Sequence, residues 1–153
     1  MYRFIFAAIV ILTSSASYAD LATTGWKKEN PNELAYFAFA DDHCSFTSAK
    51  VAEITESALI RARIKALGGI AWAYEPMHLF VAVSCTRQLN QTTTYLVIVK
   101  VGDYSSAKPI FLQESKRYGV YGVGRRSQIL SDLRGALGDQ ITYYLKANFD
   151  HLN

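Results

Sequence analysis

Apolar and polar residues alternate along two segments in the middle of the chain, His78–Thr86 and Thr94–Val101. One face of the first segment carries Leu79, Val81, Val83 and Cys85, and one face of the second carries Tyr95, Val97, Val99 and Val101. A period of two residues is typical of strands that bury one face. A third strand is predicted from Ile110 to about Tyr121, and short polar connections predict an antiparallel meander of the three.

Apolar residues at helical spacing predict two helices. The first is predicted from about Thr47 to Leu67, where Gly68 and Gly69 are expected to end it. Its apolar stripe consists of Val51, Ile54, Ala58, Ala62 and Ala66. The second is predicted over residues 127–148, with Leu130, Leu133, Leu137, Ile141 and Tyr144 facing a sheet. Gly135 and Gly138 weaken this helix by about 1 kcal/mol each relative to Ala, and we expect them to permit close approach to the sheet or to the first helix.

A short apolar run, Glu33–Ala40, is predicted as a buried strand because its two Phe and one Tyr favour a strand over a helix. The order of elements is then β-α-β-β-β-α. This order predicts an α+β fold, a two-layer sandwich in which an antiparallel sheet of three or four strands carries both helices on one face. Residues 33–153 are expected to form a single domain after a polar leader over residues 20–32.

The N-terminal segment has the pattern of a secretory signal peptide over residues 1–19. Arg3 is followed by an uninterrupted apolar run, Phe4–Leu12, and small residues precede the predicted cleavage site before Asp20. The apolar run covers only about half of the roughly 20 residues that a transmembrane helix needs. We therefore expect a mature, soluble protein without a membrane span, in the periplasm or secreted.

Charge and cysteine content limit the classes of function. The chain has 16 basic and 13 acidic residues, a net charge of +3 that falls to +2 when Arg3 is removed with the signal peptide. This charge is too small to imply nucleic acid or a charged membrane surface as a partner. Cys44 and Cys85 are predicted to form a disulfide in an oxidising compartment. A redox-active or metal-binding thiol pair is the alternative, but catalytic dithiols usually lie close together in sequence.

The densest group of potential metal ligands is the run from Asp41 to Cys44, which also contains His43. Neighbouring residues of an extended segment point in different directions, so no metal site and no cofactor are expected here. His78 opens a predicted strand and has no carboxylate or nucleophile near it in sequence. No nucleophile elbow, zinc-binding helix motif or phosphate-binding loop occurs in the chain.

The segment 116–126 is the most unusual in composition, with four cations, two tyrosines and three glycines. Its candidate binding surface consists of Lys116, Arg117, Tyr118, Tyr121, Arg125 and Arg126. Backbone N–H groups at a helix start favour anions, and arginines can bind carboxylates or phosphates in a bidentate manner. The alternative is a twisted strand end whose cations are only solvated.

These features favour an exported envelope protein that acts as a non-enzymatic interaction or accessory module. Its partner is expected to be another envelope protein or an acidic or glycan ligand. Reversing the charges of the 116–126 segment should then keep the fold and abolish partner binding. A small extracytoplasmic hydrolase that uses His43 or His78 with a carboxylate is one alternative, and a secreted inhibitor of another enzyme is a second.

Overall fold

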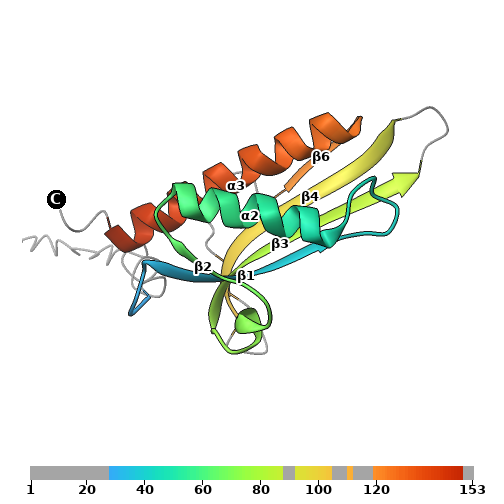
Figure 1. Cartoon of the computed structure of the whole chain (residues 1–153). Coiled ribbons are helices and arrows are strands. Elements are labelled where there is room, and N and C mark those ends of the chain that lie inside the picture. Colours follow the sequence, from blue (N-terminus) through green and yellow to red (C-terminus); the bar gives the residue numbers. More distant parts are fainter. Residues whose placement is uncertain (1–27, 88–91, 105–109, 112–118, 150–153) are drawn as a thin grey trace, which may run out of the picture.

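The computed structural model describes residues 28–87, 92–104, 110–111 and 119–149. In order, the elements are β1 (Glu33–Ala40), α2 (Ser48–Arg61), β2 (Lys65–Leu67), the 3₁₀ turn η1 (Ala71–Ala73), β3 (Met77–Arg87), β4 (Thr93–Asp103), β5 (Ile110–Phe111), β6 (Gly119–Gly124) and α3 (Arg126–Phe149). Figure 1 shows α2 and α3 side by side on one face of the sheet. The predicted α+β class is therefore confirmed.

The sheet is mixed, whereas a purely antiparallel sheet was the expectation. Its strand order is β2-β1-β3-β4, and both β5 and β6 pair with β4. β1 pairs in parallel with β2 on one side and with β3 on the other. The prediction was wrong here because α2 carries the chain back to the end of the sheet where β1 began. The next strands therefore run in the same direction as β1.

The C-terminal half of the sheet follows the predicted meander. β3 and β4 form a long antiparallel pair, in which Met77 lies opposite Asp103 and Arg87 opposite Thr93. The strand predicted from Ile110 to about Tyr121 appears as β5 and β6, both antiparallel to β4. Residues 112–118 lie outside the described residues.

The core forms between the sheet and the two helices, as the periodicity predicts. The inward-facing residues of β3 and β4 (Leu79, Val81, Val83, Cys85, Tyr95, Val97, Val99 and Val101) are all buried. The stripe of α3 (Leu130, Leu133, Leu137, Ile141 and Tyr144) is buried against them. Of the predicted stripe of the first helix, Val51 and Ile54 are buried and the three alanines are partly buried, and Leu59, which the stripe did not include, is buried as well. Among the described residues, no α-helix covers the other face of the sheet (Figure 1).

Helix α2 ends at Arg61, six residues before the predicted end at Leu67. Arg63 adopts a left-handed conformation with φ 61°. The N–H of Ile64 then donates to the Leu59 oxygen at 2.9 Å, and that of Arg63 donates to the Ile60 oxygen at 3.0 Å. This pair of bonds is a Schellman ending, whose hydrophobic contact joins buried Ile64 to buried Leu59. Helical periodicity continues through this break and conceals it.

A tyrosine–carboxylate hydrogen bond ties each helix to the sheet. The hydroxyl of Tyr36 in β1 donates to Glu56 of α2, and that of Tyr95 in β4 donates to Asp132 of α3. Burial raises the pKa of Tyr95 to about 12, with Asp132 adding to the shift, so the phenol stays protonated and can donate. Both helices are thus anchored through buried or half-buried polar pairs as well as through apolar packing.

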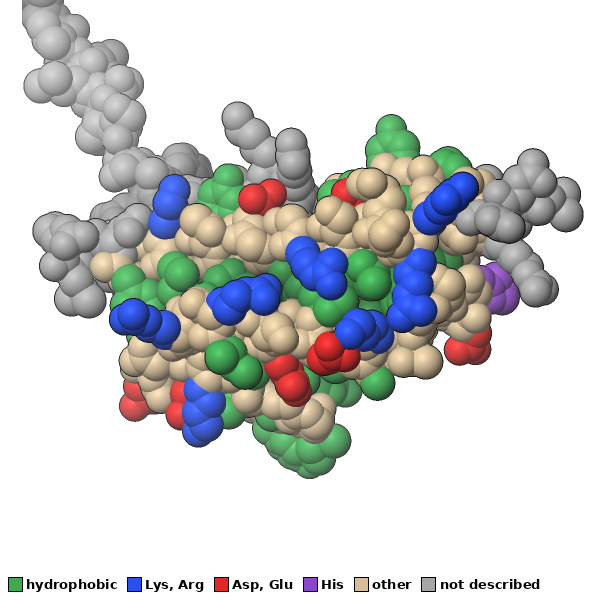
Figure 2. All heavy atoms as spheres, turned by 45° about the horizontal axis from the view of Figure 1, so that its top comes forward, with side chains coloured by type: hydrophobic (Ala, Val, Ile, Leu, Met, Phe, Trp, Pro, Cys, Tyr) green, Lys and Arg blue, Asp and Glu red, His purple; other side chains and the backbone are tan. Residues whose placement is uncertain are grey.

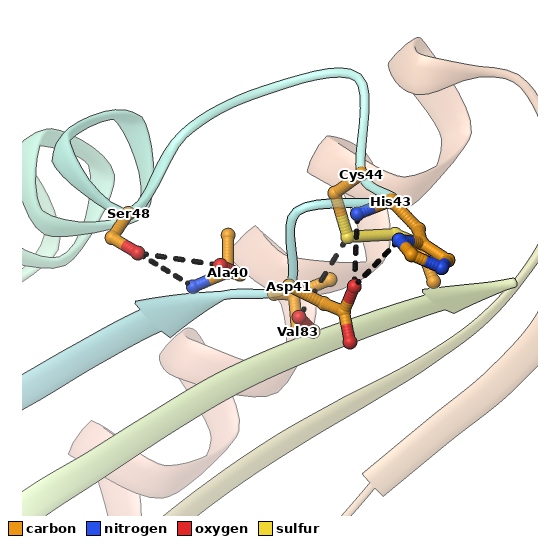
Figure 3. The surroundings of a disulfide bond; sticks show 7 residues. Ala40, Asp41, His43, Cys44, Ser48 and Val83 are labelled. Atoms are coloured by element: carbon orange, nitrogen blue, oxygen red, sulfur yellow. Dashed lines mark hydrogen bonds and ion pairs between the residues drawn. A yellow bond between two sulfur atoms is a disulfide. The ribbon is translucent and has the colours of Figure 1, made fainter.

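Cys44 and Cys85 form a disulfide with a Cα–Cα distance of 5.1 Å, as predicted. Cys44 lies just after β1, where the Asp41 N–H still donates to the Val83 oxygen at 2.9 Å. Figure 3 shows the disulfide beyond the end of the β1–β3 pairing, and it shows the Ser48 hydroxyl hydrogen-bonded to the backbone of Ala40. The disulfide therefore extends the contact between β1 and β3 past their last hydrogen bonds.

Gly135 and Gly138 lie on the exposed side of α3, and a Cβ at either position would meet no atom within 4 Å. The expected close approach to the sheet or the first helix is therefore wrong. Since alanine costs less backbone entropy in a helix, Gly135→Ala and Gly138→Ala should each raise the free energy of unfolding by about 1 kcal/mol. Urea denaturation of each variant and of the double variant measures this effect, and an unchanged midpoint for both would contradict it.

Candidate functional site

The sheet face without helices is unusually apolar. Strand alternation places Phe37 and Phe39 of β1, Phe80 of β3 and Leu96 of β4 on this face. Phe39 is 43% exposed and Leu96 is 39% exposed, and β6 adds Tyr121 at 85%. Exposed apolar patches of this kind are typical of sites that bind proteins or other ligands.

A pocket of about 490 Å³ opens at one end of this face. It is lined by Phe37, Trp72, Ala73, Tyr74, Glu75, Pro76, His78, Phe80 and Tyr104. The segment 72–76 comes from η1 and the turn that follows it, and it stands beside the ends of β1 and β3. The backbone N–H of Tyr104, the residue after β4, donates to the Pro76 oxygen at 2.7 Å and holds this turn in place.

The aromatic rings of the pocket are arranged in two orientations. Phe37 and Phe80 lie almost parallel with centroids 5.4 Å apart, while Trp72 stands nearly perpendicular to Phe37 at 5.0 Å. The imidazole of His78 stacks on the Tyr104 ring at 4.0 Å and lies 6.1 Å from Trp72. Offset and edge-to-face contacts of this kind are favourable for aromatic rings, so these side chains form a preorganised apolar wall.

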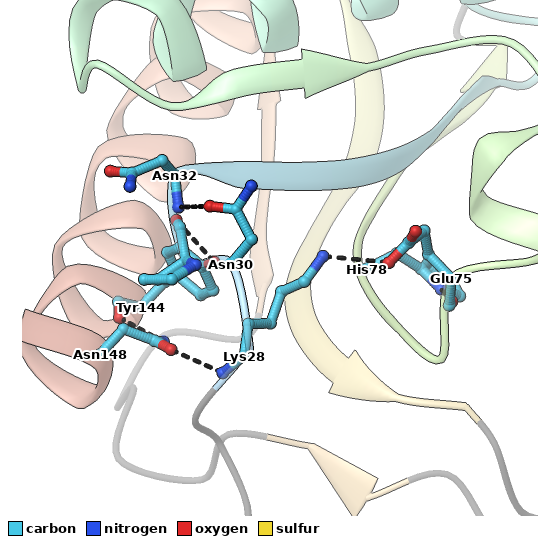
Figure 4. A network of polar contacts seen from close by, with 8 residues as sticks. Lys28, Asn30, Asn32, Glu75, His78, Tyr144 and Asn148 are labelled. Atoms are coloured by element: carbon cyan, nitrogen blue, oxygen red, sulfur yellow. Dashed lines mark hydrogen bonds and ion pairs between the residues drawn. The ribbon is translucent and has the colours of Figure 1, made fainter.

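The polar groups of the pocket balance one another in charge. The Lys28 ammonium lies 3.1 Å from a carboxylate oxygen of Glu75. Figure 4 shows the Lys28 backbone beside the C-terminal end of α3 and its side chain extending toward the turn that carries Glu75. Lys28 is also held through its backbone N–H, which donates to the Asn148 side chain at 2.9 Å. Burial raises the pKa of Tyr104 to about 12. At neutral pH the wall therefore carries one ion pair and no net charge.

His78 is only 5% exposed, and burial lowers its pKa below the usual 6.5. Its Nδ1 lies 3.4 Å from the Glu75 backbone oxygen, which can only accept a hydrogen bond. The ring is therefore neutral at pH 7, with the proton placed on Nδ1. It adds to the uncharged aromatic wall.

Acid should destabilise the fold through His78. Because its folded pKa is lowered, the unfolded chain binds this proton first as the pH falls. The stabilising contribution of the neutral ring is complete above the unfolded pKa of 6.5 and is lost as the pH falls from there through the folded pKa. Urea midpoints at about pH 7.5 and about pH 5 should therefore differ more for the wild type than for His78→Phe, which keeps a ring against Tyr104. Equal pH dependence in both proteins would contradict this account.

The other candidate ligands lie apart from the pocket. Nδ1 of His43 lies 3.4 Å from Asp41 in the exposed loop after β1, and Cys44 of the same run is bonded to Cys85. Within the described ranges, no three His, Cys, Asp or Glu side chains form a group that could hold a metal ion.

The structure separates the residues of the predicted 116–126 surface. Tyr121 projects from β6 on the face without helices, whereas Arg125 and Arg126 are exposed at the start of α3. Lys116, Arg117 and Tyr118 lie outside the described residues. Gly122 of this segment has a structural role, because a Cβ there would lie 2.8 Å from the Tyr95 hydroxyl.

The pocket has no local signature in the sequence. Its rings come from β1, η1, β3 and the residue after β4, so no short motif brings them together. One signal was present in the strands, where Phe37, Phe80 and Ile98 make the outward faces apolar as well as the inward ones. Strands that are apolar on both faces, in a sheet that the described α-helices cover on one face, indicate a second buried or ligand-binding surface.

No protein-family model and no curated protein sequence matches the chain. Within residues 28–87, 92–104, 110–111 and 119–149, no helix has the length and apolar character to cross a membrane. The fold and the site therefore define a disulfide-bonded α+β protein with an uncharged aromatic pocket on its open sheet face.

Proposed function

We propose that this protein is an exported, non-enzymatic binding module that holds an apolar segment of another envelope protein in its aromatic pocket. One observation carries the proposal: rings in two orientations enclose a pocket of about 490 Å³ that has no net charge at neutral pH. This volume is in the range of ligand sites, and such sites are mainly apolar with few polar groups.

The chemistry of the wall selects the ligand. A cationic ligand would compete with Lys28, which already neutralises Glu75, and an anionic ligand would meet the Glu75 carboxylate. A neutral, flat group such as a proline ring or an aromatic side chain can stack on Phe37 and Trp72 without an electrostatic cost. The apolar sheet face beyond the pocket, with Phe39 and Leu96, suits the rest of an extended segment.

Titration with labelled peptides that carry no charge outside the central position tests the proposal. Peptides with a central proline or aromatic residue should bind the mature, oxidised protein, and matched peptides with central alanine or lysine should not. Trp72→Ala should weaken binding about 30-fold or more, the effect of removing an interface hot spot of about 2 kcal/mol. Ile70→Ser is the matched control, since Ile70 is 67% exposed and adjoins η1 but does not line the pocket.

Two results would overturn this assignment. One is equal binding of all four peptide classes, and the other is unchanged affinity of a folded Trp72→Ala protein. The hydrogen-bonded sheet and the disulfide do not involve Trp72. Circular dichroism can therefore separate loss of binding from loss of fold.

A hydrolase is the second candidate function, and one observation favours it. His78 is a neutral histidine inside a pocket, with its pKa lowered by burial, and a general base needs these properties. The two candidates differ in what His78→Phe should do. A binding module should keep its peptide affinity, whereas a hydrolase that uses His78 as its base should lose turnover of ester or peptide substrates.

A further inference from the structure

The helix-bearing face has a charge pattern that the net charge of the chain conceals. Figure 2 shows Lys and Arg side chains in a row across this face, with fewer Asp and Glu side chains among them. The cations of the helices and their flanking residues are Lys50, Arg61, Arg63, Arg125, Arg126, Arg134 and Lys146. The acids of the same two helices are Glu53, Glu56, Asp132 and Asp139.

The seven cations outnumber the four acids, and among the described residues only Lys50 of these cations forms an ion pair. Glu53 pairs with Lys50 at 2.6 Å, Glu56 accepts from Tyr36, and Asp132 accepts from Tyr95 and Gln128. The remaining cations are exposed, and none forms an ion pair with another described residue; they are Arg61, Arg63, Arg125, Arg126, Arg134 and Lys146. The face is therefore electropositive as a whole.

An exposed apolar residue lies within this basic face. Ile60 of α2 is 67% exposed and precedes Arg61, while Lys50 lies eleven residues, about three turns, from Arg61 on the same flank of the helix. On α2, Ile60 shares its stripe with the exposed acids Glu53 and Glu56, and the cations line the adjacent flank. An exposed aliphatic side chain beside a row of cations is typical of surfaces that lie on anionic lipids. The cations contact headgroups, and the aliphatic chain enters the acyl boundary. A soluble polyanion would gain nothing from Ile60.

We infer that the helix-bearing face docks on an anionic phospholipid surface. Arginines suit this role because the guanidinium binds a phosphate in a bidentate manner. The inference is independent of the proposed function, which uses the opposite face of the sheet. A protein bound in this way would present its aromatic pocket away from the membrane, toward other proteins.

Co-sedimentation with phosphatidylcholine vesicles, with and without phosphatidylglycerol, tests the inference. The wild type should sediment only with phosphatidylglycerol present, and the binding should weaken as salt is added. Arg61→Gln/Arg134→Gln should bind these vesicles about 30-fold more weakly, from the usual contribution of two cations at an anionic surface. Inorganic phosphate at the same phosphate concentration should not displace the protein.

Lys65→Gln/Lys100→Gln is the matched control, since it changes the net charge equally. Lys65 pairs with Glu33 at 3.0 Å, and Lys100 lies on the opposite face of the sheet by strand alternation. Ile60→Ser should weaken vesicle binding about tenfold by removing an inserted aliphatic chain. Trp72→Ala should sediment like the wild type, whether or not peptides bind the pocket.

Three outcomes would overturn the inference. They are failure of the folded wild type to sediment with phosphatidylglycerol vesicles, equal losses in the arginine and lysine double variants, and wild-type binding by Ile60→Ser. Binding of the basic face to heparin without binding to vesicles would assign the row of cations to a soluble polyanion instead.

Discussion

Replacing Cys44 and Cys85 together with alanine is expected to lower the free energy of unfolding by about 4 kcal/mol. The bridge joins residues 41 positions apart and closes a loop that contains α2, β2 and η1. In the chain-entropy model, opening a loop of about this length gives the unfolded chain that much freedom. For a domain of ordinary stability, this is a large part of the total.

Urea denaturation of the double alanine variant measures the loss, and the wild type with reductant is the parallel measurement. Alanine is preferable to serine because Cys85 is only 6% exposed, and a buried hydroxyl would add its own cost. A loss below about 1 kcal/mol would contradict the prediction. Such a result would mean that the unfolded chain is already compact around these residues.

Gly122→Ala is expected to lower the free energy of unfolding by about 2–3 kcal/mol, although it adds one methyl group to a strand. Gly122 lies directly opposite Tyr95 in the β4–β6 pair. The new Cβ would lie 2.8 Å from the Tyr95 hydroxyl oxygen and 3.0 Å from the ring carbon that bears it. Tyr95 is 4% exposed, so its ring can move only by disturbing the core and the hydrogen bond to Asp132.

A double-mutant cycle makes this prediction specific. In a Tyr95→Phe background the nearest clashing atom is absent, so Gly122→Ala should cost less than it does in the wild type. An equal cost in both backgrounds would refute the proposed clash with Tyr95. Gly135→Ala and Gly138→Ala provide the contrast, because the same substitution on the open side of α3 should stabilise the protein.

The local elements of this fold could be predicted because burial leaves a periodic pattern. The inward faces of β3 and β4 and the stripe of α3 are buried as their spacing indicates. The disulfide could be predicted from an even cysteine count and an expected oxidising compartment. Each of these predictions depends on residues near in sequence, or on a pair with no competing partner.

The remaining features depend on which elements are neighbours, and periodicity does not contain that information. β2 has three residues and lies within an apparently helical stretch, so only the left-handed turn at Arg63 separates it from α2. The parallel pairing of β1 with β3 depends on the path of the whole α2 crossover. The pocket depends on the same pairing, because Phe37 meets Phe80 only in the parallel register.

The basic face shows a similar limit. A net charge of +3 sums over the whole chain, and it does not indicate how the charges are distributed on the folded surface. Among the described residues, most of the cations without an ion pair lie on the two helices. Three acids of these helices accept hydrogen bonds from tyrosines or pair with Lys50. Charge segregation of this kind arises from side-chain partners, which a residue count does not show.

The parallel pairing of β1 with β3 also determines the order in which the chain can fold when its N-terminal residues emerge first. Ala40 pairs with Val83, so one edge of β1 stays without its neighbour until β3 has emerged. During that interval Cys44 has no intramolecular partner, because Cys85 lies in β3 itself. An unpaired strand edge invites association with other chains, and a free thiol invites mixed disulfides. The interval before β3 emerges is therefore when this protein is most exposed to mispairing.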